Sequence, residues 1–221
     1  MYPVSLNING QLCIVIGGGK VAERKVLSLL EAGAQVRLIS PQLTEKLQEL
    51  AAVRGIDWLA RRFQPGDLNG ALLVFAATDS AAVNEAVAQE AKAAGILVNV
   101  ADAPELCSFQ VPAVVRQGDL SIAISTNGKS PALSARIRKK LAADYGPEYA
   151  VLLELLGKIR ERTLAEETDE QTRKNLFEQL PHEEMLLWIK TGQDERLRTV
   201  LETARNIRQA ENKSAAPRHT L

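Results

Sequence analysis

Residues 12–22 read LCIVIGGGKVA: five apolar residues, then a glycine turn, then the start of a helix. The unbroken apolar run predicts a strand buried on both faces, as in a parallel sheet. The turn fits the pattern Gly-x-Gly-x-x-Gly/Ala, with Gly17, Gly19 and Ala22 at its three fixed positions. A strand, this turn and a helix in that order predict a dinucleotide-binding unit.

Each small residue of the turn has a separate physical task. Gly17 permits the tight turn, Gly19 lets the backbone approach a pyrophosphate, and Ala22 lets the helix pack close to the strand. The free N–H groups at the start of the helix then face the anion. The predicted cofactor is a nicotinamide dinucleotide, with contacts from Gly17, Gly18, Gly19, Lys20 and Val21. A strand-to-helix turn without a ligand is the alternative interpretation.

The position that would bind the ribose lacks its usual acid. The second predicted strand, residues 35–39, is followed by Ser40-Pro41-Gln42, where an Asp or Glu is expected. The choice between NAD and NADP therefore stays open. The other predicted cofactor contacts are Ser40, Pro41, Gln42 and Thr78. Arg37 is predicted to be a solvated edge charge, and Asp79 to lie in the N-cap region of the next helix.

Short apolar runs alternate with helical patterns through the first half of the chain. This alternation predicts an α/β fold of Rossmann type, a doubly wound parallel sheet with helices on both faces. The remaining strands are predicted at 35–39, 56–60, 72–77 and 97–100.

The pattern changes after Pro104. Residues 109–116 and 120–125 predict an antiparallel hairpin, and Ser130-Pro131 predicts a capped helix start. Helical patterns then run to about residue 211, with breaks near 168, 181 and 191. The predicted domains are a Rossmann domain (1–112), a hairpin-plus-helix region (113–145), a small all-helical C-terminal domain (146–211) and a disordered tail (212–221).

Composition excludes several classes of function. The 221 residues carry 27 basic and 27 acidic side chains, with two Trp, three Tyr and four Phe, which argues against a surface for nucleic acid. No apolar run approaches the roughly 20 residues that cross a bilayer, and the start lacks a basic signal sequence, so we expect a cytoplasmic protein. We expect neither a disulfide nor a metal site, because the chain has only two cysteines, Cys13 and Cys107, and two histidines, His182 and His219.

Five blocks of sequence, in order, resemble the precorrin-2 dehydrogenase / sirohydrochlorin ferrochelatase family of siroheme biosynthesis. They are GGGKVAERK (17–25), AATD (76–79), VNVADAP (98–104), SFQVP (108–112) and STNGKSP (125–131). The resemblance implies NAD-dependent oxidation of precorrin-2 to sirohydrochlorin in a homodimer, with residues 113–145 as the dimerisation and substrate region. No methyltransferase module follows, so the chain resembles a stand-alone member.

The family's catalytic Asp falls on Asp102. Oxidation of the macrocycle removes a hydride and a proton, and a carboxylate beside the nicotinamide can take the proton. Without the resemblance, Asp102 could equally be a turn residue before Ala103-Pro104.

The tetrapyrrole is a polycarboxylate, so its site needs cations. Residues 129–140 carry five basic side chains and no acidic one. Predicted substrate contacts are Ser125, Thr126, Lys129 and Arg136. A solvated basic helix and an ordinary turn are the alternatives. Some family members have a phosphorylated serine where this chain has Thr126, so any modification of Ser125 or Thr126 stays open.

Two questions stay open at this point. The enzyme could also insert iron, with ferrous ion as a co-substrate and the macrocycle as its ligand. A different class of function, a non-enzymatic dinucleotide-sensing regulatory module, would account for the missing ribose acid and the long helical C-terminus.

Overall fold

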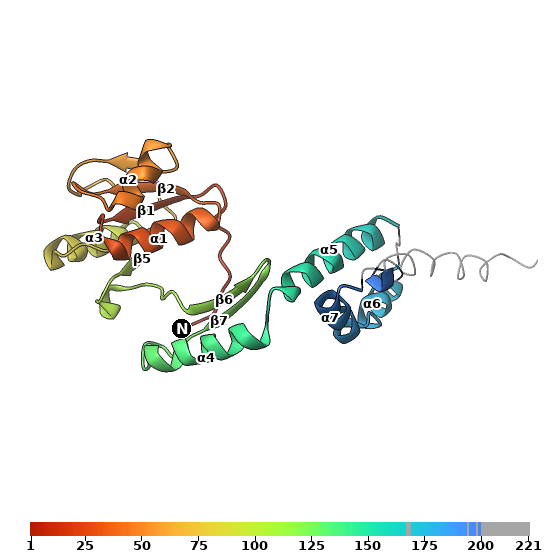
Figure 1. The fold of residues 1–221 in the computed structure, drawn as a ribbon. Coiled ribbons are helices and arrows are strands. Elements are labelled where there is room, and N and C mark those ends of the chain that lie inside the picture. Colours follow the sequence, from red (N-terminus) through yellow and green to blue (C-terminus); the bar gives the residue numbers. More distant parts are fainter. Residues whose placement is uncertain (167–168, 194, 198, 200–221) are drawn as a thin grey trace, which may run out of the picture. The chain divides into compact units, whose positions relative to one another are not determined.

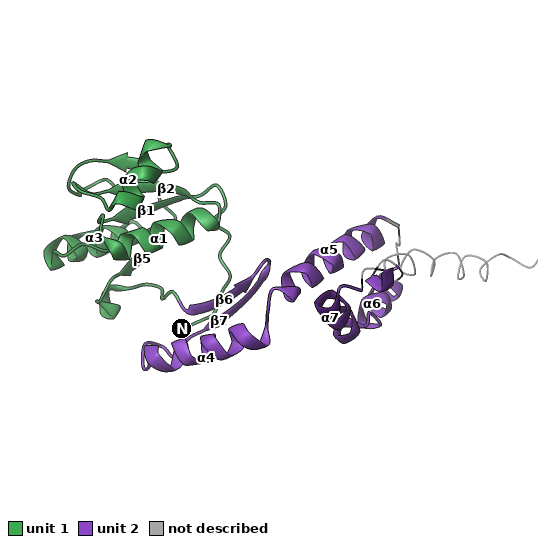
Figure 2. Cartoon of the chain, in the orientation of Figure 1, with its two compact units in different colours: residues 1–111 green, residues 112–221 purple. Residues whose placement is uncertain are grey.

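The computed structural model describes residues 1–166, 169–193, 195–197 and 199. The chain divides into two compact units, residues 1–111 and 112–221 (Figure 2). The glycine turn belongs to the first unit, and the hairpin and the later helices belong to the second.

The first unit is built on a five-stranded parallel sheet (Figure 1). Its strands are β1 (Leu12–Ile16), β2 (Gln35–Ile39), β3 (Asp57–Leu59), β4 (Leu73–Ala76) and β5 (Leu97–Val100), in the order β3-β2-β1-β4-β5. The chain moves outward from β1 to β3 and then crosses to β4 on the other side of β1. The carboxyl ends of β1 and β4 therefore flank the point where the winding reverses, which is where ligands bind in such sheets. The predicted doubly wound α/β fold is confirmed.

Both faces of the sheet are covered, which explains the unbroken apolar run of β1. Cys13 and Val15 pack into a core with residues of α1 (Lys20–Glu31) and α2 (Glu45–Ala52), whereas Ile14 and Ile16 join the core with α3 (Ala81–Ala93). Each of these β1 side chains is at most 1% exposed. Burial raises the pKa of the Cys13 thiol to about 11, so this cysteine is a neutral packing residue.

The helix ends in this unit follow local chemistry. The chain leaves α1 through Gly33, whose φ of +76° is left-handed. Ser80 is the N-cap of α3, and its hydroxyl accepts from the Val83 N–H at 3.4 Å. Asp79 lies one residue before this cap, so Ser80 and not Asp79 performs the capping.

After β5 the chain turns through a short 3-10 helix, η1 (Pro104–Leu106), and returns along the edge of β5. The Val98 N–H donates to the Ser108 hydroxyl at 2.8 Å, and the Ser108 N–H donates to the Val98 carbonyl at 2.9 Å. Phe109 packs edge-on against Phe75 of β4, with ring centroids 5.5 Å apart. The returning segment therefore satisfies backbone groups that an edge strand would otherwise expose.

The second unit starts with a hairpin of β6 (Ala113–Gln117) and β7 (Leu120–Ile124), followed by α4 (Pro131–Asp144). The first strand of this hairpin was predicted to begin at residue 109. It begins only after Pro112, because Ser108 and Phe109 are bonded to β5 and proline has no N–H to donate to a strand ladder.

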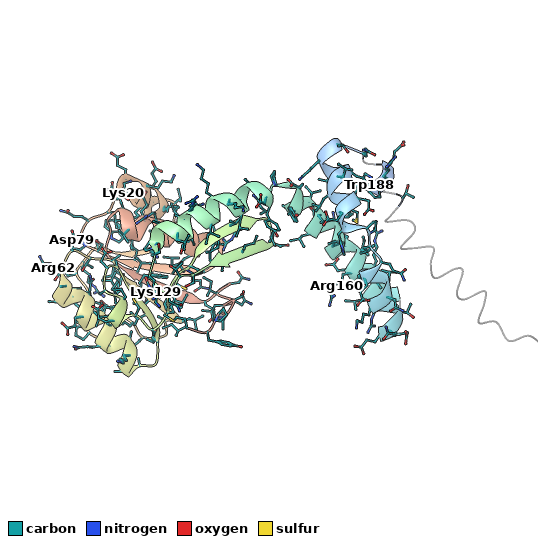
Figure 3. All side chains as sticks on the ribbon, turned by 90° about the horizontal axis from the view of Figure 1, so that it is seen from below. Lys20, Arg62, Asp79, Lys129, Arg160 and Trp188 are labelled. Carbon is teal, nitrogen blue, oxygen red and sulfur yellow. The ribbon has the colours of Figure 1, made fainter. Side chains whose placement is uncertain are left out.

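The remaining helices form a small core of their own. They are α5 (Glu148–Glu166), α6 (Glu170–Glu178) and α7 (His182–Thr191), packed around Leu152, Ile159, Met185 and Leu186. The Lys190 ammonium pairs with Glu148 at 2.8 Å and joins α7 to α5. The guanidinium of Arg160, labelled in Figure 3, lies 5.7 Å from the ring centroid of Phe177.

Among the described residues, no helix combines the length and apolar character needed to cross a membrane. The division of the second unit near residue 145 stays a prediction. The predicted end of the helical domain at 211 and the predicted tail, 212–221, lie outside the described residues.

Candidate active site

The glycine turn joins β1 to α1 at the carboxyl edge of the sheet. Gly17 has a φ of +117°, and a Cβ there would overlap the Ala77 carbonyl that follows β4. Its N–H donates to the Ile39 carbonyl at 3.0 Å. Gly17 is therefore required by a left-handed backbone and by the close approach of the neighbouring strand end.

The middle glycine has a role that the pattern did not predict. A Cβ on Gly18 would overlap the Gln42 carbonyl and lie 2.7 Å from the Ser40 hydroxyl oxygen. The Gly18 carbonyl accepts from the Thr44 N–H at 3.0 Å. Gly18 thus lets the loop after β2 pack directly on the turn, although its position in the pattern is unrestricted.

Gly19 differs from both neighbours because a Cβ there would meet no atom within 4 Å. It is the N-cap of α1, and no side chain caps this helix. The N–H groups at the start of α1 are thus available to an anion, and the open space beside Gly19 lets a pyrophosphate approach the backbone. The residues present therefore fit a dinucleotide.

Two charged residues flank the start of α1. Lys20, labelled in Figure 3, is 80% exposed and pairs with Glu23 at 3.1 Å. The hydroxyl of Thr44 also donates to the Glu23 carboxylate, at 2.5 Å. These two contacts, Thr44 first and Lys20 second, lower the pKa of Glu23. Glu23 therefore ties the first turn of α1 to the segment after β2.

The three residues predicted at the ribose position differ in exposure. Ser40 is 7% exposed, its hydroxyl donates to the Gln42 carbonyl at 2.7 Å, and its own carbonyl accepts from Trp58 Nε1 at 2.9 Å. Pro41 and Gln42 are exposed. Ser40 therefore shapes the loop, and the outward-facing groups are those of Pro41 and Gln42. Arg37, predicted as a solvated edge charge, is partly exposed and pairs with Asp57 at 2.6 Å.

Thr78 lies after β4, in a turn that Asn84 of α3 holds. The Thr78 hydroxyl donates to Asn84 Oδ1 at 2.8 Å, and Asn84 Nδ2 donates to the Thr78 carbonyl at 3.0 Å. Asn84 is 8% exposed. Asn84 was not predicted as a site residue, because an Asn within a helix carries no distinctive sequence pattern.

Asp102 is the second residue after β5 and is exposed. The Ala101 N–H donates to the Ala76 carbonyl at 2.8 Å, so the turn that holds Asp102 starts beside the end of β4. Asp102 has a φ of +60°, a left-handed conformation that Asp adopts more readily than most residues. Parallel strands end at one edge of the sheet, so Asp102, Thr78 and the glycine turn share that edge. Figure 3 shows Lys20 and Asp79 at this end of the sheet.

The four predicted substrate contacts belong to the second unit. The Ser125 hydroxyl accepts from the Asn127 N–H at 3.1 Å. The Thr126 hydroxyl accepts from the Ser130 N–H at 3.1 Å and lies 3.2 Å from the Ser134 hydroxyl. Both therefore have a structural role in the turn before α4, whereas Lys129 and Arg136 are exposed cations. Within the described ranges, no group of three His, Cys, Asp or Glu residues could hold a metal ion.

Two family models match the chain. One, described as NAD(P)-binding, matches residues 4–113, and the other, for the central part of a sirohaem biosynthesis protein, matches residues 117–143. The siroheme synthases of Methylobacillus flagellatus and Nitrosococcus oceani are 37% and 38% identical to this chain over 200 and 202 residues. The chain belongs to the siroheme synthase family. The family resemblance found in the sequence is confirmed.

This member of the siroheme synthase family matches only part of those relatives. The aligned regions cover 90% and 91% of this chain but 43% of each relative. A solved structure named SirC, precorrin-2 dehydrogenase, has a TM-score of 0.77 and 26% identity, and the match covers 93% of this chain and 100% of that chain. Within this family member, residues 4–113 form an NAD(P)-binding domain, as the glycine turn predicts.

Proposed function

We propose that this protein is an NAD-dependent precorrin-2 dehydrogenase, which oxidises precorrin-2 to sirohydrochlorin in siroheme biosynthesis. The observation that carries the proposal is the Asp102 carboxylate, exposed after β5 at the sheet edge where α1 begins without a side-chain cap. The similarity to SirC, precorrin-2 dehydrogenase, supports the choice of substrate.

The first unit would bind the cofactor and supply the proton acceptor. The turn at Gly17, Gly18 and Gly19, with Lys20 and Val21, binds the pyrophosphate, and Pro41, Gln42 and Ser40 line the ribose side. Thr78 bounds the same edge. When bound, NAD supplies a nicotinamide that accepts a hydride. Asp102 accepts the proton that the macrocycle loses in the same oxidation, so the hydride and the proton are both accounted for.

The second unit would supply substrate binding. Lys129 and Arg136 are exposed cations suited to the carboxylates of the tetrapyrrole, since charge-assisted hydrogen bonds are stronger than neutral ones. Ser125 and Thr126 shape the turn that presents Lys129. Lys129→Met and Arg136→Met should each raise the KM for precorrin-2 and leave the KM for NAD unchanged.

The decisive experiment is turnover of precorrin-2 with NAD, followed by the spectrum of sirohydrochlorin. Asp102→Asn keeps the shape of the side chain and tolerance of a left-handed φ, so a loss of kcat of about 10²-fold or more would report the carboxylate itself. Asp79→Asn is the matched control, because Asp79 is an exposed carboxylate after the neighbouring strand and has no proposed role. Unchanged kcat in Asp102→Asn would remove Asp102 from the mechanism.

We propose a homodimer formed through residues 113–145, because β6 and β7 form a two-stranded sheet that pairs with no other strand in the described part of the chain, which leaves edges for a second copy. Sedimentation tests this. We also propose ferrous ion as a co-substrate, and adding it to the same assay tests this. The cytoplasm is the proposed location, since Cys13 and Cys107 are free thiols.

A regulatory module remains the competing class of function. It predicts that the protein binds NAD in calorimetry but leaves precorrin-2 unchanged at every cofactor concentration. Turnover by the purified protein would exclude it.

A further inference from the structure

Two side chains behind the Asp102 turn have no place in the proposed chemistry, yet they hold that turn from both sides. They are Asn99 of β5 and Cys107, the residue after η1. Both are partly buried. Neither was predicted as a site residue.

The Cys107 thiol bridges the two ends of the turn. The Val100 N–H donates to the sulfur at 3.1 Å, and the thiol lies 3.3 Å from the Val100 carbonyl and 3.4 Å from the Ala103 carbonyl, both of which can accept its proton. Val100 precedes the turn and Ala103 follows it. One sulfur atom therefore fixes the backbone on both sides of Ala101 and Asp102.

The Asn99 amide fixes the sulfur and the returning chain. Asn99 Nδ2 donates to the Phe109 carbonyl at 3.1 Å and lies 3.7 Å from the Cys107 sulfur. Ser108, between them, is bonded to Val98 through both its amide and its hydroxyl. Cys107 is thus anchored by the strand that carries Asp102.

The turn itself needs such support. Asp102 has a φ of +60°, and a single residue with a side chain in this conformation persists only where its surroundings hold it. Exposed loops without fixed backbone contacts move on nanosecond to microsecond timescales. A displacement of about 1 Å between a catalytic group and its substrate can reduce a rate by about 10²-fold.

We propose that Asn99 and Cys107 are positioning residues, which hold the left-handed turn that presents the Asp102 carboxylate to the substrate. The inference rests on the proposed function, because it assigns them a role in proton transfer by Asp102. It adds to that function a thiol that acts through hydrogen bonds and not as a nucleophile or ligand. Weak S–H and S-acceptor contacts are sufficient here because three of them act on one short segment.

The kinetic test uses Cys107→Ala, Cys107→Ser and Asn99→Ala in the full chain. Alanine at 107 removes all three contacts and should lower kcat about tenfold, with the KM for NAD within twofold of the wild type. Serine keeps a donor and an acceptor at the same site and should restore much of kcat. Asn99→Ala should also lower kcat, because it removes the contacts of the Asn99 amide with the Cys107 sulfur and the Phe109 carbonyl.

Leu29→Ala is the control for stability. Leu29 is buried in α1, in the core that does not include Cys107 or Ala103, so its truncation destabilises the unit without removing a contact of the turn. If Cys107→Ala lowers kcat no more than Leu29→Ala at matched stability, or if serine restores nothing, the positioning role is wrong.

A second readout does not require turnover. In Cys107→Ala the Val100 amide loses its acceptor, so its hydrogen exchange should accelerate by at least tenfold relative to the Ala101 amide, which still donates to Ala76. A wild type inert toward precorrin-2 would overturn the proposed function and, with it, the catalytic purpose of the turn. If the hydrogen exchange of the Val100 amide is unchanged in Cys107→Ala, Cys107 does not hold the turn, even in an active enzyme.

Discussion

The helices α1 and α4 both follow a turn rich in small residues, but their N termini are built in opposite ways. α1 begins at Gly19, with no side-chain cap and open space beside the backbone. α4 begins at Ser130, whose hydroxyl accepts from the Leu133 N–H, with Pro131 in the first turn. One helix leaves its N–H groups for a ligand, and the other satisfies them within the chain.

The difference matters for anion binding, because an uncapped N-terminus offers N–H groups that a capped one has already bonded within the chain. At α4 the Thr126 and Ser134 hydroxyls bond to each other, and the hydroxyls of Thr126, Ser130 and Ser134 all bond to backbone groups. In the proposed function, substrate recognition by this region would therefore use the exposed cations Lys129 and Arg136 and not the helix end. At α1 the backbone N–H groups themselves would bind the pyrophosphate.

The largest effect is expected from Gly18→Ala. The new Cβ would overlap the Gln42 carbonyl, so the loop after β2 must move, with a loss of about 1–3 kcal/mol in the free energy of unfolding. Urea denaturation measures this loss. Gly157→Ala is the matched control, because Gly157 lies within α5 with no atom within 4 Å of its would-be Cβ, and alanine there should stabilise the helix. A Gly18→Ala protein as stable as the wild type would contradict the packing described for the loop.

Gly19→Ser would make α1 resemble α4. The serine hydroxyl can accept from an N–H of the first turn and would occupy the space beside the backbone, so the Kd for NAD should rise about tenfold, or about 1.4 kcal/mol. The unliganded fold should keep its stability or gain a few tenths of a kcal/mol. Calorimetry with NAD, beside a thermal melt without it, separates the two effects. Unchanged affinity would mean that this helix end does not bind the pyrophosphate.

Ser130→Ala is the converse change at α4. Loss of the cap should cost about 1 kcal/mol of unfolding free energy, and Ser130→Gly only a few tenths. NAD affinity should not change in either variant. An equal cost for alanine and glycine would show that the serine acts through something other than capping.

The smallest effect concerns the acid in the first turn of α1, for which α4 has no equivalent. The pKa of Glu23 is lowered from its usual 4.5 by the Thr44 hydroxyl and then by Lys20. A folded-state pKa below the unfolded value stabilises the fold above about pH 4.5, and this stabilisation is lost as the pH falls through the folded value. Thermal melts from pH 7 to pH 3 should therefore fall less steeply for Glu23→Gln than for the wild type. Parallel curves would show that the Glu23 contacts add nothing.

Much of the first unit could be predicted from the sequence because its signals are local. The strand at 12–16 and the strand at 35–39 have the predicted bounds, since apolar runs between turn residues mark buried strands directly. In the second unit, the cap at Ser130 was likewise predicted from two adjacent residues. The first hairpin strand was placed too early, because Ser108 and Phe109 are bonded to β5 and no local pattern predicts those contacts.

The candidate site was only partly predictable for the same reason. Its position at the end of β5 follows from strand order, but the contacts that shape it join residues distant in sequence. Asn84 bonds to Thr78, Thr44 bonds to Glu23, and the Gln42 carbonyl packs closely on Gly18. The local sequence around either partner does not predict these contacts.

By itself, the sequence determined the alternation of strands and helices, the glycine turn and the family, because hydrophobic period and turn chemistry act between near neighbours. Only the tertiary structure decided why Gly18 must be glycine, which hydroxyls are already bonded within the chain, and how Asn99 and Cys107 hold the Asp102 turn. Those properties depend on which parallel strands end side by side. That adjacency arises from the burial of both faces of the sheet and not from any short stretch of chain.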